Sequence, residues 1–393
     1  INKFVAVYWG PAGLAVVGQT QNFLNVASHA LTLGGSNAVV RSLSSQEDRV
    51  ERAALLKLVL TVLAVTYLVA AGLLLVLHDA LPGLFFIPRV GAAPIALVLV
   101  ACLPFVSLYT VSLAVLNGDR RMRGYFTLMA LNAVLMLVCT TAGLSLFGEL
   151  GLLAGLCLSY LVSALACLGL GVFSVGPAEL MRSAYPTRAQ RRKLANICLM
   201  SLTAAVVAPV ATLVVRTMLG NSGGADQAGL WDGLLRISDA YLMLFTLPMA
   251  AYLLPAFSAA SEVAAQRREL RQGLGFVGLC LPIVAIVVFL VREPLINILY
   301  DERFLEIAPI MHYQLAGDCL RMLGWVLGYF LLAREHTRAF ITADLTAALL
   351  QVLMASLLVP RLGVTGAVWS MLAGYGLYLV VCARVVSRHL RED

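Results

Sequence analysis

Three charged side chains lie on one face of a predicted apolar helix. Asp232, Arg236 and Asp239 occupy positions i, i+4 and i+7 within residues 230–257. A charged side chain near the bilayer centre costs about 2.5–3.5 kcal/mol on insertion scales, so it normally faces the protein interior and has a partner. Both carboxylates are within reach of Arg236 on this face. An arginine neutralised in this way is also suited to anion binding, because the planar guanidinium grips phosphate oxygens with two hydrogen bonds.

Two further arginines lie inside predicted helices. Arg321 forms an i, i+3 pair with Asp318 near the middle of residues 305–332. Arg216 lies about one turn from the outer end of residues 194–219, where its side chain can extend to the membrane surface, so a purely structural role is as compatible with its position as substrate binding. Structural salt bridges and binding of an anionic substrate both explain these residues. The candidate substrate-binding residues are Arg216, Arg236 and Arg321, and the candidates for ion coupling or for pairing with the arginines are Asp232, Asp239 and Asp318.

A polar stripe runs along the predicted helix 14–40. It consists of Gly18, Asn22, Asn25, His29, Thr32 and Ser36, with Gln19 and Gln21 beside it. This spacing places the stripe on one helical face. Such a face either joins neighbouring helices or lines a water-filled cavity. The members taken as candidate substrate-binding residues are Gln21, Asn22, Asn25 and His29.

The elements that must position these residues are membrane-spanning helices. Hydrophobic residues make up 61% of the 393 residues, charged residues make up 12%, and the mean hydropathy is +0.89. Soluble proteins carry about 25% charged residues. About 20 apolar residues cross the hydrocarbon core, and the predicted spans are 14–40, 54–77, 93–116, 125–147, 150–173, 194–219, 230–257, 274–291, 305–332, 339–359 and 363–386. Residues 1–7 are interpreted as the outer end of a further helix whose beginning is missing, which gives twelve.

Basic residues alternate between the predicted connections. Most of the 28 lysines and arginines fall in segments that the twelve-helix topology places in the cytoplasm, and the opposite side holds Arg89, Arg292, Arg303 and Arg361. This is the positive-inside pattern, with the C-terminus in the cytoplasm. The basic residues therefore indicate topology, and no nucleic-acid-binding motif accompanies them.

The chain divides into two similar halves. The basic connection 174–193 separates a lobe of six predicted helices, 1–173, from a second lobe, 194–393. Residues 150–155 resemble residues 362–367, and other similarities recur at about the same offset. An even number of helices gives both halves the same orientation, so the repeat is parallel. We expect an all-α, two-lobe membrane transporter.

Short sequence patterns that resemble cofactor-binding and catalytic motifs occur here without the secondary structure that such motifs require. Gly273–Gly278 has GxGxxG spacing but opens an apolar helix with no preceding strand, and no lysine follows a glycine, which excludes a P-loop. The eight cysteines lie in apolar runs and form no metal-binding pattern. The connections leave little room for a catalytic domain. The sequence therefore favours a transporter over an enzyme, with no cofactor and no metal.

Three segments resemble the Wzx-type flippases of the multidrug/oligosaccharidyl-lipid/polysaccharide (MOP) superfamily. They are Gly10–Gly13 followed by Gly18–Asn22, Arg236–Leu242, which matches basic-Ile-Ser-acidic-x-Tyr-Leu, and Gln314–Asp318, which matches Gln-Leu-x-Gly-Asp. The resemblance extends over essentially the whole chain. The nearest branch moves the repeat unit of O-antigen or enterobacterial common antigen. Asp239 departs from the pattern, which has glutamate there.

The resemblance implies a twelve-helix, two-lobe exporter of the MOP/MATE-like fold. Such a protein passes undecaprenyl-diphosphate-linked oligosaccharide from the cytoplasmic to the periplasmic leaflet of the bacterial inner membrane by alternating access. Its partners would be this substrate, the lipid bilayer, and polysaccharide polymerase and chain-length proteins. A cation- or proton-coupled multidrug or small-molecule antiporter of the same superfamily is the alternative. A membrane polymerase or ligase is disfavoured because the outer loops are short.

Overall fold

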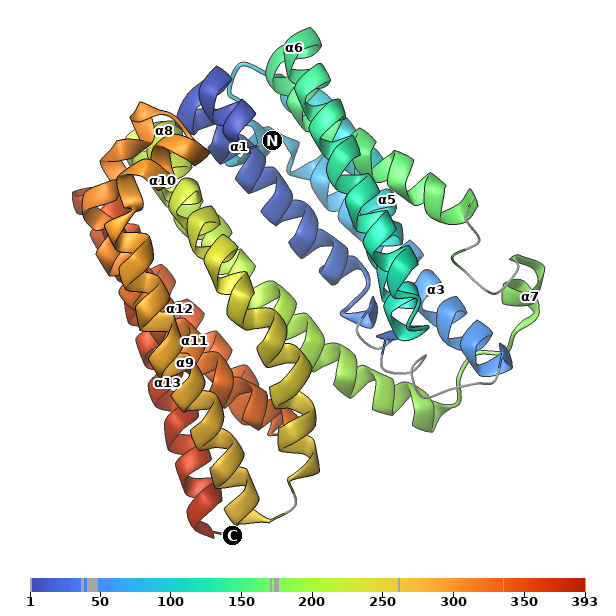
Figure 1. Ribbon diagram of the computed structural model, residues 1–393. Helices are drawn as coiled ribbons and strands as arrows, with labels where there is room; N and C mark the ends of the chain where they lie inside the picture. The colour runs from blue at the N-terminus through green and yellow to red at the C-terminus, as the bar shows by residue number, and fades with distance from the viewer. Residues whose placement is uncertain are drawn as a thin grey trace. The chain divides into compact units, whose positions relative to one another are not determined.

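A computed structural model of the chain describes residues 2–36, 39–40, 49–169, 172, 177–260, 262–334 and 336–392 (Figure 1). In these ranges the regular structure is entirely helical, which confirms the predicted all-α class. Eight helical stretches are long and apolar enough to cross a membrane. The helices are α1 Asn2–Leu31, α3 Arg49–Val76, η1 His78–Ala80, α4 Leu81–Leu84, α5 Ala92–Gly118, α6 Met122–Gly169, α7 Pro177–Arg182, α8 Arg188–Ala259, α9 Val263–Leu290, α10 Arg292–Leu299, η2 Glu302–Ile310, α11 Met311–Ala333, α12 Thr337–Leu362 and α13 Val364–Glu392.

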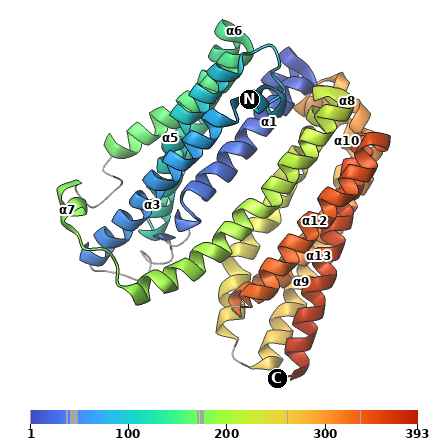
Figure 2. The same ribbon diagram turned by 180° about the vertical axis from the view of Figure 1, so that it is seen from behind.

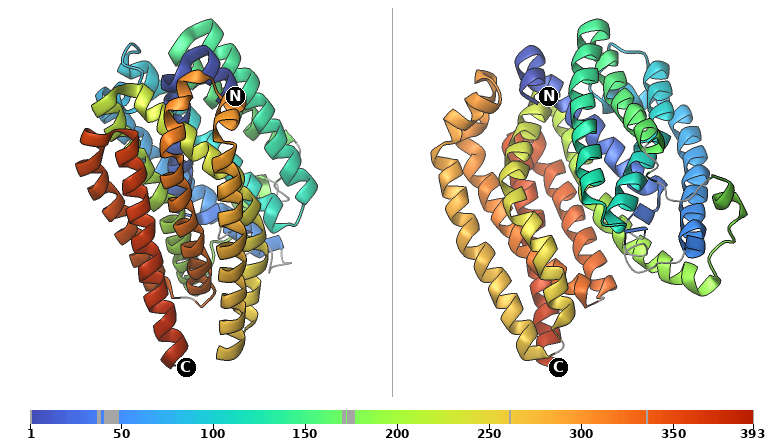
Figure 3. Two further views of the ribbon diagram at one scale, coloured as in Figure 1. Left: turned by 60° about the vertical axis from the view of Figure 1, so that its left-hand side comes forward. Right: turned by 45° about the vertical axis from the view of Figure 1, so that its right-hand side comes forward.

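Single glycines divide the longest helices into two arms. Gly148 in α6 and Gly224 in α8 have φ values of 62° and 80°, which L side chains rarely adopt. In α6 the two arms return side by side, because Gly143 and Gly151 each lie against the carbonyl group of the other (Figure 3, right). The pairs of spans predicted from the sequence are therefore the arms of α6 and of α8.

The repeat inferred from the sequence is present in the backbone. Gly10 in α1 (φ 71°, ψ −163°) corresponds to Gly224 in α8 (φ 80°, ψ 170°), 214 positions later. Gly148 (φ 62°, ψ −139°) corresponds to Gly363 (φ 54°, ψ −130°), 215 positions later. Equivalent turns in the two halves thus depend on glycine in nearly the same conformation.

Helix packing divides the chain into two compact units. The first comprises residues 19–209, and the second comprises residues 2–18 and 210–393. In the first unit α5 packs against α6 and α3, and in the second α13 packs against α12 and α11 (Figures 1 and 2). The unit boundaries fall inside α1 and α8, so each of these helices contributes to both units.

Two helix ends differ from the sequence prediction. The helix predicted over 14–40 ends at Leu31, because the backbone turns at Thr32–Gly34, where Leu33 and Gly34 have positive φ. Thr32 and Ser36 therefore lie beyond the helix, although both are buried. The helix predicted over 305–332 begins at Met311, and the residues before it form η2. Hydropathy located the spans, but it does not register local turns.

The turn glycines allow a direct test of backbone strain. Replacing Gly148 by alanine should lower the free energy of unfolding by about 1–3 kcal/mol, because its φ and ψ values are open essentially to glycine alone. The added methyl group itself meets nothing within 4 Å. Gly72→Ala in α3 is the matched control, since its Cβ is equally free and alanine favours the helix. Thermal unfolding in detergent should show a loss for Gly148→Ala only, and equal effects would contradict the assignment.

Candidate functional site

The α8 hairpin brings Arg216 and Asp232 together, because each lies eight residues from the turn at Gly224. The Arg216 Nη2 donates to the Asp232 Oδ1 over 2.5 Å, and both side chains are only 4% exposed. Arg216 is therefore buried and does not extend to the membrane surface. Two buried opposite charges join the arms of the hairpin within an apolar helix pair.

The Asp232 carboxylate also holds the second arginine of this helix. The Arg236 Nε donates to the Asp232 Oδ2 over 2.7 Å, and the Arg236 side chain is 20% exposed. One carboxylate thus accepts hydrogen bonds from two guanidiniums, so these three side chains together carry a net charge of one positive unit. We call Arg216, Asp232 and Arg236 the arginine cluster. Its excess charge favours an anionic ligand, and Arg236 is its more accessible member.

Gly18, the first member of the polar stripe, lies against the arginine cluster. A Cβ atom at this position would overlap the Asp232 carboxylate. One and a half turns earlier, the backbone N–H of Ala12 donates to the Asp226 Oδ1 over 3.1 Å. Both contacts join residues that are 214 positions apart, so equivalent helices of the two halves meet here within the second unit. Gly18 therefore allows close approach to Asp232.

Tyr300 contacts the backbone of the second arm of α8. Its hydroxyl donates to the Gly233 carbonyl oxygen over 3.0 Å, and its ring stacks on Phe304 at 4.5 Å between centroids. Burial raises the pKa of the Tyr300 hydroxyl, so this group remains a neutral donor. The sequence analysis did not identify Tyr300, because a tyrosine in a short outer connection carries no distinguishing pattern.

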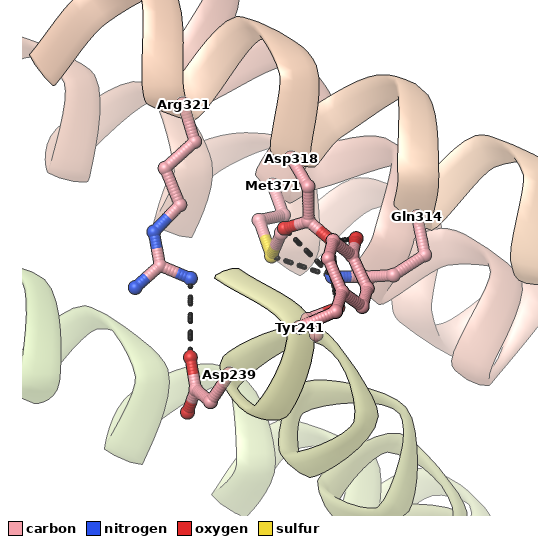
Figure 4. Close-up of polar contacts among 7 residues, drawn as sticks. Asp239, Tyr241, Gln314, Asp318, Arg321 and Met371 are labelled. Carbon is pink, nitrogen blue, oxygen red and sulfur yellow. Dashed lines mark hydrogen bonds and ion pairs between the residues drawn. The ribbon is translucent and has the colours of Figure 1, made fainter. Parts of the chain in front are cut away.

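Asp318 belongs to a second polar cluster, between α11 and the second arm of α8 (Figure 4). It is fully buried, and its Oδ2 accepts hydrogen bonds from the Ser238 hydroxyl over 2.6 Å and the Tyr241 hydroxyl over 2.5 Å. The Gln314 Nε2 lies 3.4 Å from both carboxylate oxygens and donates to Ser238 over 3.0 Å. We call Ser238, Tyr241, Gln314 and Asp318 the Asp318 cluster.

Asp318 and Arg321 lie on one face of α11, but among the described residues no ion pair joins them directly. Arg321 instead pairs with Asp239, whose Oδ1 lies 3.4 Å from the Arg321 Nη1 (Figure 4). The reason is that the hydroxyl groups on α8 draw the Asp318 carboxylate away from its own helix. The Arg321 guanidinium lies over the rings of Trp325 and Tyr375, at 4.8 and 5.7 Å from their centroids.

The polar stripe of α1 has mixed surroundings within the first unit. The Asn22 Nδ2 donates to the Pro209 carbonyl oxygen over 2.8 Å, so this residue joins α1 to the first arm of α8. The Gln21 Nε2 lies 3.2 Å from the Met136 sulfur. Asn25 is exposed and His29 is half-buried. Asn22 thus fits the helix-joining interpretation, whereas Asn25 is accessible to a ligand.

Several residues of these clusters were missed at the level of sequence. Ser238 and Tyr241 lie inside the segment that carried the family resemblance, which is a signal that could have identified them. Trp325 and Tyr375 gave none, because an aromatic residue on an apolar helix is usually a packing residue. In the part of the chain that the structure describes, no group of three or more His, Cys, Asp or Glu side chains could hold a metal ion.

Comparison with known proteins agrees with this architecture. The model of the family described as "Polysaccharide biosynthesis protein" matches residues 10–309. The lipid III flippase of Escherichia coli (strain K12) is 27% identical over 390 residues, which covers 98% of this chain and 92% of that protein. Sequence similarity therefore extends through both halves.

Solved structures share the fold at lower identity. An inward-facing multidrug resistance MATE family transporter of the MOP superfamily has a TM-score of 0.79 at 16% identity, covering 98% of this chain and 92% of that chain. The lipid II flippase MurJ, in its inward closed conformation, has a TM-score of 0.71 at 12% identity, with 98% and 87% covered. These matches confirm the MOP-superfamily transporter fold.

The arginine cluster generates a prediction about stability. Replacing Asp232 by asparagine leaves two guanidiniums without their shared carboxylate, and breaking a buried pair in this way costs about 3–5 kcal/mol. Asp239→Asn is the matched control, because that carboxylate is 66% exposed and its pair should contribute under about 1 kcal/mol. Unfolding of the two variants in detergent measures the difference, and similar losses would refute the central role of Asp232.

Proposed function

The chain belongs to the polysaccharide biosynthesis protein family, and from that premise we propose that it is a flippase for lipid-linked oligosaccharides. The proposed substrate is an undecaprenyl-diphosphate-linked repeat unit of O-antigen or enterobacterial common antigen. It moves from the cytoplasmic to the periplasmic leaflet of the bacterial inner membrane by alternating access, and the C-terminus is cytoplasmic. Similarity to a lipid III flippase over 98% of the chain supports this proposal.

The observation that carries the proposal is the excess positive charge of the arginine cluster. Arg216 and Arg236 share the single Asp232 carboxylate inside an apolar hairpin. A diphosphate is the part of the proposed substrate that most needs charge compensation in a medium of low dielectric constant. Arg236 binds the diphosphate directly, since its side chain is partly exposed, and Arg216 fixes the position of Asp232. The lipid tail stays in the bilayer.

Other residues of the proposed site are proposed to form hydrogen bonds with the hydroxyl groups of the sugars. Gln21, Asn22, Asn25 and His29 offer amide and imidazole groups, of which Asn25 is the most exposed. Arg321 provides further positive charge. The lobes 1–173 and 194–393, joined by 174–193, are proposed to move against each other, and polymerase and chain-length proteins are proposed partners.

The membrane potential is sufficient as a driving force in this proposal. An anion that leaves a negative interior gains about 2.3 kcal/mol per charge per 100 mV. The diphosphate carries this charge outward, so transport needs no nucleotide-binding domain. Asp232, Asp239 and Asp318 are candidates for a coupled ion.

The Asp318 cluster favours a second candidate, a cation- or proton-coupled antiporter of small molecules. Asp318 is a buried carboxylate whose hydrogen-bond donors among the described residues are neutral groups. Such a group can exchange a proton or a cation. Drug-susceptibility assays separate this candidate from the flippase, because only an antiporter of small molecules should change tolerance to toxic compounds.

The arginine cluster also provides the functional test. Arg236→Ala, expressed in a strain that lacks its own flippase, should reduce surface polysaccharide at least tenfold and cause the lipid-linked intermediate to accumulate, because the diphosphate loses its direct ligand. Arg236→Lys should retain part of the activity that Arg236→Ala loses, since lysine keeps the positive charge but lacks the planar guanidinium with its two parallel donors. The measurements are glycan display and membrane-inserted protein.

The matched control is Arg361→Ala, which removes an exposed arginine from the last turn of α12. It should leave glycan display unchanged at equal protein levels. Full display by Arg236→Ala would refute the assignment of this residue. Altered drug tolerance without any glycan defect would favour the antiporter.

A further inference from the structure

The turn of α1 at Gly10 is held by an arginine from a distant part of the chain. The Arg303 guanidinium lies against Gly10, since a Cβ atom added there would overlap it. Its Nη2 donates to the Ala6 carbonyl oxygen over 2.9 Å and to the Val7 carbonyl oxygen over 3.3 Å. These contacts join η2, which precedes α11, to the first arm of α1.

The carbonyl groups that Arg303 contacts lie at the end of this first arm. A helical carbonyl accepts from the N–H four residues later. The residue four positions after Val7 is Pro11, which has no N–H. The end of a helix also carries partial negative charge, which favours a cation there. Arg303 thus supplies a donor that the α1 backbone lacks.

The equivalent turn in the second half shows that such an arginine is not needed to form the turn itself. Gly224 in α8 has nearly the same φ and ψ values as Gly10. A Cβ atom added at Gly224 nevertheless meets nothing within 4 Å. The same backbone conformation therefore occurs without a side chain packed on it. The contribution of Arg303 is the link that it makes between η2 and α1.

Asp301 and Lys3 reinforce this link. The Asp301 Oδ2 accepts from the Arg303 Nε over 2.7 Å, and its Oδ1 accepts from the Arg303 backbone N–H over 3.1 Å. These two bonds orient a guanidinium whose side chain is half exposed. From the α1 side, the Lys3 Nζ donates to the Ile298 carbonyl oxygen over 2.7 Å. The two segments are thus joined in both directions.

Phe304, the residue after Arg303, contacts α8. A Cβ atom added at Gly233 would come too close to the Phe304 ring, and the Tyr300 hydroxyl donates to the Gly233 carbonyl oxygen. Gly233 directly follows Asp232 in the chain. One short segment therefore contacts α1 through residue 303 and α8 through residue 304, next to the arginine cluster.

The link bears on the arginine cluster because α1 lies directly on its carboxylate. Gly18 leaves room for Asp232 only while α1 stays at this distance. The turn at Gly10 is eight residues from Gly18, about 12 Å along the helix. Displacement of α1 at this turn would therefore change the contact with Asp232, and the Asp232 Oδ2 accepts the hydrogen bond that positions Arg236.

We propose that Arg303 is a positioning residue for the arginine cluster. It fastens α1 to η2 and so keeps Gly18 against Asp232, which holds Arg236 in place for the diphosphate. This role rests on the proposed flippase function, and it adds to that function a residue outside the proposed binding site.

The test measures transport by the full chain in proteoliposomes that contain increasing mole fractions of a polyprenyl diphosphate with a neutral sugar. The rate is followed as the sugar becomes available to a membrane-impermeant oxidant. Arg303→Ala should raise the half-saturating mole fraction about three- to tenfold, as for loss of one hydrogen bond, and leave the maximal rate within about twofold. The charges of the cluster remain in this variant, but they are no longer held in one position.

Two further variants and a matched control isolate the link. Arg303→Lys should keep most of the affinity, since an ammonium group still donates to carbonyl oxygens. Asp301→Asn should weaken affinity less than Arg303→Ala, because it only frees the guanidinium, and it carries the test if Arg303→Ala does not fold. The control is Arg292→Ala, which removes an equal charge from the same connection but whose described contacts are with Phe289 and Glu293. It should behave as the wild type.

Amide hydrogen exchange gives a readout that needs no substrate. Arg303→Ala should increase the exchange rate of residues 2–18, because α1 loses its link to η2. The turn of α6 at Gly148 belongs to the other unit and should exchange at the wild-type rate. Equal exchange of residues 2–18 in the wild type and the variant would refute the link.

The transport outcomes separate this role from the flippase function. An unchanged half-saturating mole fraction in Arg303→Ala, with a wild type that transports, would refute the positioning role and leave the flippase function intact. A lower maximal rate at unchanged half-saturation would assign Arg303 to the transport movement instead. Failure of the wild type to transport the diphosphate lipid would refute the flippase function and this role with it.

Discussion

A single carboxylate that is shared by two arginines inside an apolar hairpin sets the chemistry of this protein. Asp232 holds Arg216 at 2.5 Å and Arg236 at 2.7 Å, and the group carries one excess positive charge. Isolated charges would be very costly in such surroundings. The shared carboxylate lowers that cost without cancelling the charge, so the same contacts that keep the hairpin together leave it able to bind an anion.

Two glycine residues allow the backbone to bring the arginines and Asp232 together. Gly224 places Arg216 opposite Asp232 by turning α8 back on itself, and Gly18 lets α1 approach the carboxylate without a side chain. Gly10 has nearly the same backbone conformation as Gly224 in the other half of the repeat. The equivalent helices of the two halves meet beside the arginine cluster, with Gly18 at the position that corresponds to Asp232.

The sequence was sufficient to predict the architecture, because every helix that crosses the lipid bilayer needs a run of about 20 apolar residues. Runs of apolar residues located the helices, and a shared offset of about 214 residues revealed the repeat. The pairing of Arg236 with Asp232 followed from i, i+4 spacing. Asp318 and Arg321 have equally suitable spacing, yet they separate, because Ser238, Tyr241 and Asp239 reach them from another helix. Sequence spacing identifies possible partners on the same helix. It cannot show whether a residue on another helix, brought close by tertiary packing, is the preferred partner.

The most direct test of this account is whether purified protein in vesicles distinguishes a polyprenyl diphosphate from a polyprenyl monophosphate that carries the same neutral sugar. An excess positive charge at Asp232 and its two arginines predicts faster translocation of the diphosphate-linked sugar, with a further increase when the receiving side is made electrically positive. Equal translocation of the two lipids, independent of the potential, would mean that the arginine cluster does not hold the charged part of the substrate.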